Sequence, residues 1–422
     1  MDGCSRPSRR WERIDDDLVE RRADLDRLTH HDAVSQERID GFLDARGATR
    51  DAVKRLPDAL PGTTAASPLL GGADTHRAWP TYIAGGAEPP LADPATQGRT
   101  HTIESIVGET VELGIFDPAR GPALTADSGD VLHYPNTLTH FLGAVEPGTP
   151  IDTIAQLRRD NPGRGPMTLV GPVAVRGAAP GDVLELRVLR CDPVDFGFNF
   201  NNPADLGTGA LLDEFPEGQV RYFELDHASM TTRWGPNIRI PLGPFQGTLG
   251  VCPDVDRPVS AVPPGPHAGN LDLRELVAGT TLFVPVWKPG ALIYTGDSHV
   301  AQGDGEVNLT AIESAMRDLR AEVVLHKQAP LRWPLVETPT HWLALGFDAD
   351  LNEAFRVCLR NAVEFLVRCA GLTPLDAYGL CSVAVSFRVT QVVDGNKGVH
   401  GMIPKDLFIP EARRAIDPLG RG

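Results

Sequence analysis

The spacing of hydrophobic positions changes along the chain, and the first spacing is helical. Over residues 1–56, apolar side chains recur every three or four residues with charges between them, beginning with Trp11, Ile14, Leu18, Leu25 and Leu28. Gly47 ends this periodicity, and a short third helix fits before Leu56. The pattern predicts a helical N-terminal extension, which serves either as a small cap on its own core or as a docking or oligomerisation arm.

Residues 57–98 lack this periodicity and are rich in Pro, Gly, Ala and Thr, which predicts a linker or surface strap. Residues 99–265 then take the alternating pattern of strands. Two Gly-Asp-Val-Leu segments, at 129–132 and 181–184, pair a turn with a strand start. Repeated turn-and-strand units predict a β-rich domain with a sandwich-like or barrel-like core.

The last part, residues 266–422, mixes both patterns and predicts an α+β domain. Residues 282–294 are expected to form a β-hairpin around Lys288-Pro289-Gly290. An apolar stripe from Leu351 to Cys369 predicts a five-turn helix that ends at Gly371. Thr373 is expected to cap a second helix, and alternation from Val383 to Val389 predicts a strand. The fold class is therefore mainly β with an α+β C-terminal part.

Composition excludes some classes of function but does not point to a particular one. The chain has 40 basic and 56 acidic residues, a net charge of −16, so it is expected to repel nucleic acids and anionic membranes. No apolar run approaches the length of a membrane span. Six scattered cysteines form no C-x-x-C pair and favour a reduced, cytoplasmic setting. The Gly and Pro content (43 and 37) agrees with many tight turns.

Candidate chemistry concentrates in residues 270–306. The chain contains no H-E-x-x-H, Walker loop or Gly-x-Ser-x-Gly elbow. It does contain Asp297 and His299, two positions apart on a predicted strand and therefore on one side of it. Gly303 and Gly305 allow the chain to fold back and present Glu306 beside them.

Asn270 and Asp272, further upstream, are also two positions apart. Each fragment alone is more typical of a turn or a helix cap than of a functional site. Together they predict a metal site or an acid/base site.

These residues resemble the acetamidase/formamidase family. The resemblance rests chiefly on Asn270-Leu271-Asp272 and on Gly296-Asp297-x-His299-x-x-x-Gly303-Asp304-Gly305-Glu306. It is supported by Gly171-Pro172-Val173, Ala179-Pro180-Gly181-Asp182, Gly247-x-x-Gly250-Val251 and Gly398-Val399-His400, and it covers residues 101–409 in consistent order. The resemblance implies a metal-supported hydrolase of short aliphatic amides, with a β-rich N-terminal part, assembled as a homodimer or larger homo-oligomer.

The resemblance also suggests roles for single residues. Asp297, His299 and Asp272 are expected to hold a divalent ion, zinc first and calcium second. Glu306, with Asp304 beside it, is expected to carry the proton chemistry. Asn270, the backbone near Gly250 and His400 are expected to contact the small amide substrate. His133 and His140 are further candidates, although ordinary half-buried positions explain them equally well.

Three departures from the family pattern keep alternatives open, one of them Ala268-Gly269 in place of the usual double glycine before Asn270. Glu112 stands where His-Trp-Gly is common, and Met167 stands where relatives often have a His before the Gly-Pro strand. These changes favour, as an alternative, a larger specialised amide, imide or formyl substrate on the same scaffold. A non-catalytic metal-binding β protein is the other alternative, and His299 argues against a calcium-only site because calcium prefers oxygen ligands.

Overall fold

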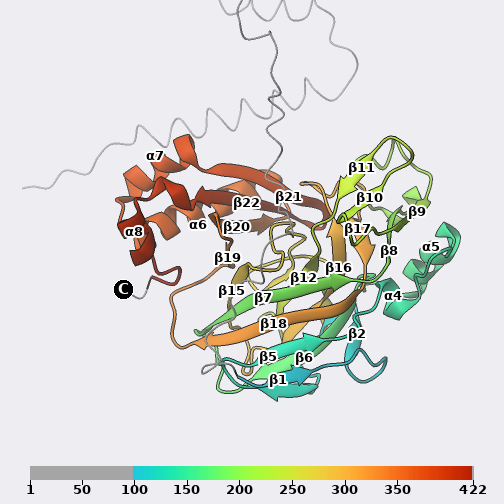
Figure 1. The fold of residues 1–422 in the computed structure, drawn as a ribbon, viewed down its shortest axis with the longest axis horizontal. Helices are drawn as coiled ribbons and strands as arrows, with labels where there is room; N and C mark the ends of the chain where they lie inside the picture. The colour runs from blue at the N-terminus through green and yellow to red at the C-terminus, as the bar shows by residue number, and fades with distance from the viewer. Residues whose placement is uncertain (1–97, 421–422) are drawn as a thin grey trace, which may run out of the picture. The chain divides into compact units, whose positions relative to one another are not determined.

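The computed structural model describes residues 98–420 (Figure 1), and the predicted helical extension and linker lie almost entirely outside this range. The described chain is mainly β, as predicted, and most of its strands form two nine-stranded sheets. Sheet 1 contains, in spatial order, β1 (Thr100–Thr102), β5 (Val131–Tyr134), β18 (Met316–His326), β7 (Val183–Pro193), β15 (Thr281–Pro285), β19 (Leu335–Glu337), β20 (His341–Asp348), β22 (Asn396–Pro404) and β21 (Ser386–Asp394).

Sheet 2 is branched at its centre. Its main path is β14 (Ala268–Asn270), β12 (Phe245–Val251), β16 (Ile293–Ala301), β17 (Ile312–Ser314), β8 (Phe196–Asn201) and β9 (Gln219–Glu224). The strand β6 (Thr168–Val175) also pairs with β16 and carries β2 (Val111–Leu113) and β4 (Leu124–Ala126). Two small ribbons complete the set of strands: β10 (Thr231–Arg233) with β11 (Arg239–Pro241), and β3 (Ile115–Phe116) with β13 (Val259–Ser260).

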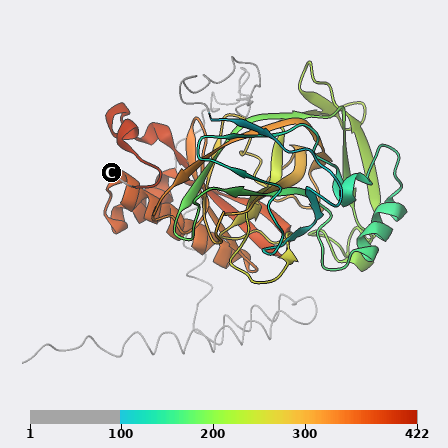
Figure 2. The same ribbon diagram turned by 90° about the horizontal axis from the view of Figure 1, so that it is seen from below.

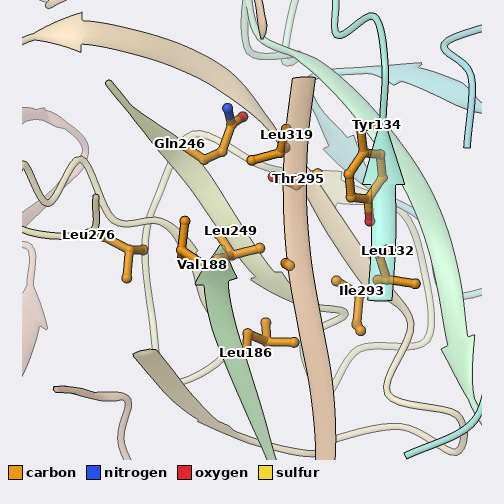
Figure 3. Close-up of a pocket in the computed structure, with 11 residues that line it drawn as sticks. Leu132, Tyr134, Leu186, Val188, Gln246, Leu249, Leu276, Ile293, Thr295 and Leu319 are labelled. Atoms are coloured by element: carbon orange, nitrogen blue, oxygen red, sulfur yellow. The ribbon is translucent and has the colours of Figure 1, made fainter. Parts of the chain in front are cut away.

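The two sheets face each other across a shared apolar core. Figure 3 shows the interior between them, with side chains from β5 and β7 of sheet 1 and from β12 and β16 of sheet 2, among them Leu132, Leu186, Val188, Leu249 and Ile293. The free space there is only about 10 Å³, so this interior is packed core and has no room for a substrate. The sandwich-like packing is as predicted, and neither sheet closes into a barrel within residues 98–420.

Strands from the two expected parts of the chain alternate within both sheets. In sheet 1, β7 lies between β18 and β15, and in sheet 2 the early β6 pairs with the late β16. Residues 98–420 all belong to one compact unit. Strands from both sides of the predicted boundary at residues 265/266 therefore pair with one another in the same sheets.

The helices form two groups. The longest is α6 (Leu351–Ala370), followed by α7 (Pro374–Ala384) and α8 (Pro410–Ala415), and Figures 1 and 2 show these three on the opposite side from α4 (His140–Gly143) and α5 (Ile151–Asp160). Single 3-10 turns occupy Ala204–Leu206 and Lys405–Leu407. Within the described chain, no helix is long and apolar enough to cross a membrane.

The helix predictions for the C-terminal part are confirmed. Gly371 ends α6 in the left-handed region with φ of 69°, and the Thr373 side chain accepts a hydrogen bond from the backbone N–H of Asp376 at the start of α7. The following strand begins at Ser386, because Val383 still belongs to α7. The five described cysteines are free thiols, and all but Cys369 are buried.

The predicted hairpin at residues 282–294 is wrong. β15 pairs with β7 and β19 in sheet 1, whereas β16 pairs with β12, β6 and β17 in sheet 2. Between them, Ala291 and Leu292 adopt left-handed backbone with φ of 61° and 60°, which carries the chain from one sheet to the other. This crossover places β16 at the centre of sheet 2.

The contact of α6 with sheet 1 yields a stability prediction. A Cβ on Gly346 of β20 would lie 2.3 Å from the Cys358 nitrogen and 2.4 Å from the Ala354 oxygen, both backbone atoms of α6. We expect Gly346→Ala to lower the free energy of unfolding by about 1–3 kcal/mol through overpacking. Gly379→Ala, inside α7 with open space around it, is the control and is expected to be neutral or slightly stabilising. Equal denaturant midpoints for the two variants would contradict the described contact.

Candidate active site

The predicted residue block folds into one end of sheet 2. β16 carries Asp297 and His299, and the loop after it turns back so that β17 runs antiparallel alongside. This register places Glu313 of β17 directly opposite His299. Because directly opposed residues project to the same face, Glu313 joins the site although it lies outside the sequence block.

The loop that presents Glu306 is attached to sheet 1. The backbone N–H of Gly305 donates to the Thr390 oxygen at 3.0 Å, and the N–H of Val392 donates to the Gly305 oxygen at 3.2 Å. β21 therefore holds the loop, and its last residue, Asp394, lines the same cavity as Glu306. The fold-back predicted from the two glycines is confirmed, and both sheets contribute to the site.

One half of the site is a group of two imidazoles and two carboxylates. His140 Nε2 lies 2.8 Å from Asp297 Oδ1 and 3.3 Å from Glu313 Oε2. His299 Nε2 lies 3.0 Å from Glu313 Oε2 and 3.6 Å from Asp297 Oδ1. Both imidazoles thus direct the same nitrogen at the same two carboxylates.

The other half contains Asp272, Glu306 and Asp394. Asn270 orients Asp272, since its Nδ2 donates to Asp272 Oδ2 at 2.8 Å while its own Oδ1 accepts from Thr248 Oγ1 at 2.6 Å. Gln302 joins the halves: its Nε2 donates to the Asp272 backbone oxygen at 2.6 Å and its Oε1 lies 2.9 Å from His299 Nδ1. With Nδ1 held by an amide oxygen, His299 Nε2 is the nitrogen that faces the cavity carboxylates.

The backbone is strained where the acids are presented. Asp272, Asp297 and Glu306 have φ of 46°, 58° and 46°, in the left-handed region that side-chain-bearing residues rarely adopt. Such conformations cost about 1–3 kcal/mol each and persist only where the surroundings enforce them. Three strained acids around one cavity therefore indicate a functional rather than a structural cluster.

Gly247 allows strand β12 to lie directly against the side chains of Asp272 and His299. Its carbonyl accepts hydrogen bonds from the N–H groups of Leu271 and Asp272 at 2.9 and 3.1 Å. A Cβ there would lie 2.6 Å from Asp272 Oδ1 and 2.7 Å from His299 Cε1. Only glycine lets β12 lie this close behind the two side chains.

The charge of the cluster cannot be balanced by its own groups. Each of the following side chains is at most 6% exposed: His140, Asp272, Asp297, His299, Glu306, Glu313 and Asp394. Burial opposes protonation of His140, but Glu313 and then Asp297 overcome it and raise its pKa to about 9. Burial likewise opposes protonation of His299, yet Glu313 and Asp297 raise its pKa. Two imidazolium groups balance two carboxylates, and three carboxyl groups remain.

In the ion-free protein, the pKa of each of these three carboxyl groups lies above its ordinary value. Burial first, with Asp297 adding and His299 opposing, raises the pKa of Asp272 to about 7. Burial and the charge of Asp272 raise the pKa of Glu306 and of Asp394 well above ordinary values. Burial would raise the pKa of Asp297 too, but His299 and His140 lower it below its usual value.

The donor set fits a divalent cation. Two groups have ligand atoms within 4.8 Å of one another: His140, Asp297 and Glu313, and Asp272, His299 and Glu306. Four buried carboxyl oxygens of the cluster lack a hydrogen bond, namely Asp272 Oδ1, Glu306 Oε2, Glu313 Oε2 and Asp394 Oδ2, although Glu313 Oε2 forms ion pairs with both imidazoles. Unsatisfied buried acceptors around a cavity are what a cation removes, and imidazole with carboxylate suits zinc.

The cavity beside the cluster has a volume of about 100 Å³. Of the predicted site residues, Asn270, Asp272, Asp297 and Glu306 line it, and His299 lies directly behind them. His140, Glu313 and Asp394 line it as well. His140 was a candidate in the sequence, whereas Glu313 and Asp394 belong to none of its motifs: Glu313 lies in the middle of β17, and Asp394 is the last residue of β21.

The remaining predicted site residues lie elsewhere. Asp304 is exposed and His400 is buried, and together with Glu275 they form a neighbouring cluster that includes Arg388, whose Nη1 lies 3.4 Å from Glu275 Oε1. Burial, Arg388 and Arg274 lower the pKa of His400 to about 3, so this imidazole is neutral. The arginine charges make this second cluster a poor cation site.

Gly250 and His133 also lie away from the cavity lining. A Cβ on Gly250 would lie 2.2 Å from the Gly269 nitrogen, so this glycine allows close pairing of β12 with β14. His133 pairs with Asp318 at 3.3 Å on sheet 1. Glu112 makes ion pairs with Arg120 and Arg164 and does not replace a ligand in this site.

Gly247→Ala tests the geometry of the cluster. The added methyl group must push Asp272 and His299 apart, so we expect zinc affinity to fall by about 10- to 100-fold, as when other groups that orient ligands are changed. Zinc titration and melting temperature are the measurements. Gly303→Ala, in the loop between β16 and Glu306 with nothing within 4 Å of its added methyl group, is the control. A Gly247→Ala variant that binds zinc like Gly303→Ala contradicts the placement of these side chains.

Removal of metal is expected to have a pH-dependent effect on stability. The raised pKa values mean that the ion-free folded protein holds protons that the unfolded chain releases above about pH 4. Stability of the ion-free protein therefore falls as pH rises towards 7, and a bound cation in place of those protons removes the loss. The melting temperature gained with zinc over chelator should be larger at about pH 7.5 than at about pH 5.5. An equal gain at both pH values would contradict the charge assignment.

Comparison with known proteins places this chain beside amide-hydrolysing enzymes of one family. The model of the acetamidase/formamidase family matches residues 164–261 and 256–409. The formamidase of Methylophilus methylotrophus is 26% identical over 321 residues, 59% of this chain and 79% of that protein. The crystal structure of an acetamidase from Bacillus halodurans has a TM-score of 0.65 and 26% identity, covering 73% of this chain and 98% of its own.

A second solved structure gives the same result. The acetamidase from Yersinia enterocolitica is 29% identical with a TM-score of 0.65, covering 73% of this chain and 92% of its own. The matched segments contain Asp272, Asp297, His299, Glu306 and Glu313. The family match spans more than half of the sequence, and the chain therefore belongs to the acetamidase/formamidase family.

Proposed function

We propose that this protein hydrolyses the C–N bond of a short aliphatic amide, giving a carboxylate and ammonia, with a divalent ion held in the buried carboxylate–histidine cluster. Membership of the family supports amide hydrolysis. The metal ion and the residue roles are the proposed part. The observation that carries them is the excess of three buried carboxyl groups at the wall of a cavity.

The ion is proposed to be held by five side chains: Asp297, His140, Glu313, His299 and Asp272. The two imidazoles favour zinc, and calcium is the second choice. Once bound, such an ion polarises an amide carbonyl or lowers the pKa of a water molecule. His140 and Glu313 extend the ligand set proposed from the sequence. Gln302 and Asn270 act as positioning residues, since they fix His299 and Asp272 respectively.

Glu306 is the proposed proton carrier. Its side chain lines the cavity, and its Oε2 has no hydrogen-bond partner, so the carboxyl group is available to a substrate or water. Ammonia leaves an amide readily only after the nitrogen is protonated, so one group has to take the proton of the attacking water and deliver it to nitrogen. The second N–H of Asn270 is available to the developing oxyanion.

Asp304, His400 and Gly250 receive different proposals from those made on sequence. Asp304 and His400 belong to the cluster beside the Glu306 loop, so we assign them to supporting that loop. Gly250 is assigned to the pairing of β12 and β14. A purely structural cation site, the non-catalytic alternative, has no need of a cavity of about 100 Å³ beside the ligands. A homo-oligomeric assembly and a cytoplasmic location remain predictions.

Glu306→Gln tests the proposed function. Removing a general acid/base lowers kcat by about 10²- to 10⁴-fold. Ammonia release from formamide and acetamide is the measurement, with bound metal quantified in each preparation. Glu214→Gln, at an exposed position, is the control and should retain full turnover. Unchanged turnover by Glu306→Gln would exclude Glu306 as the proton carrier, and equal turnover by metal-free protein would exclude a catalytic ion.

A further inference from the structure

The cavity is larger than the smallest amides require and has a second wall of different character. About 10–15 Å³ holds one water molecule, so a volume of about 100 Å³ takes more than the four non-hydrogen atoms of acetamide. Apart from the carboxylate cluster, most of the lining is apolar, including Phe141, Met167, Phe200, Val262 and Leu309. Such a wall fits a hydrocarbon chain.

The lining contains one arginine, Arg158, from the last turn of α5. Its side chain is half-buried, and within residues 98–420 no carboxylate forms an ion pair with it. The adjacent Arg159 and the nearby Arg164 differ, because they pair with Asp205 and Glu112 at 2.7 and 2.6 Å. Burial lowers the pKa of the Arg158 guanidinium.

The guanidinium of Arg158 is held in place by the segment that follows α5. Its Nη1 donates to the backbone oxygen of Arg164. Arg164 is fixed in turn, because its Nη1 donates to Glu112 Oε1 at 2.6 Å and to the Leu113 oxygen at 3.2 Å. Glu112, one of the departures from the family pattern, thus anchors the segment that orients Arg158.

A fixed, half-buried guanidinium without a counter-ion is a receptor for an anion. Leaving such a charge unpaired costs free energy, and a bound anion removes this cost. The planar fork of arginine matches a carboxylate through two parallel hydrogen bonds, and these are among the stronger hydrogen bonds in proteins. Since Arg158 and Glu306 line one cavity, a single short molecule contacts both walls.

We infer that the substrate is a short aliphatic amide whose far end carries a carboxylate, and that Arg158 is the residue that selects it. The inference rests on the proposed amide hydrolysis and names the substrate class of the same site. The scissile amide lies at the carboxylate–histidine cluster, the hydrocarbon lies along the apolar wall, and the free carboxylate pairs with Arg158.

Pairs of amides of equal chain length that end in a carboxylate or in a methyl group provide the test. Malonamate, succinamate and glutaramate are compared with propionamide, butyramide and valeramide by ammonia release. The wild-type protein should give a higher kcat/KM for the charged member of at least one pair. Loss of a hydrogen bond to a charged group corresponds to a roughly ten- to hundredfold effect, so Arg158→Gln should reduce the charged-to-neutral ratio by that factor, chiefly through KM.

Two variants control this experiment. Arg159→Gln changes the exposed neighbouring arginine and should keep the wild-type ratio. Arg158→Lys keeps the charge without the planar fork, so it should retain part of the preference and covers the case in which Arg158→Gln does not fold.

The outcomes separate this inference from the proposed function. Hydrolysis of neutral amides with no preference for any charged member, or a ratio that Arg158→Gln and Arg158→Lys leave unchanged, would overturn the anionic substrate while the hydrolase stands. No turnover of any amide by metal-loaded protein would overturn the hydrolase, and the inference with it.

Discussion

The structure depends on one electrostatic constraint: five carboxyl groups and two imidazoles are buried around a single cavity. Like charges in a poorly solvated interior repel strongly, so each surplus carboxylate requires a proton or a cation. The imidazoles of His140 and His299 balance two of the acids. The remaining three explain why a divalent ion is the simplest occupant and why the site is suited to polar chemistry.

The two-sheet scaffold is what allows these groups to converge. Sheet 2 supplies His299, Asp297 and Glu313 from adjacent strands, while sheet 1 holds the Glu306 loop through β21 and adds Asp394. Left-handed backbone at three of the acids is costly. The shared core between the sheets and the close approach of Gly247 enforce these conformations, so the packed core and the site are parts of one arrangement.

Local patterns predicted the parts of the fold that local forces determine. The helix from Leu351 and its end at Gly371 follow from periodicity and from a left-handed glycine. The prediction of a hairpin at residues 282–294 was wrong because the same alternation fits two strands of one sheet or strands of two different sheets. Ala291 and Leu292 adopt left-handed backbone, and neither residue type indicates this in the sequence. The N-terminal predictions, residues 1–97, lie outside the described chain.

The candidate site was predictable only where its residues are neighbours in sequence. Asp297, His299 and Glu306 stand in one block and converge as expected. Glu313 enters through strand register, and Asp394 enters through a contact between segments about ninety residues apart, neither of which leaves a mark on the sequence. His400 shares the family motif but turns towards Glu275 and Thr390 instead.

The most direct test of the central claim is anomalous X-ray diffraction at the zinc edge from crystals of active, zinc-loaded protein. The account predicts an anomalous peak within bonding distance of His140 or His299 and of the carboxylates between them. Crystals of fully active protein with no anomalous peak in this cluster, and with only water among the carboxyl groups, would contradict it.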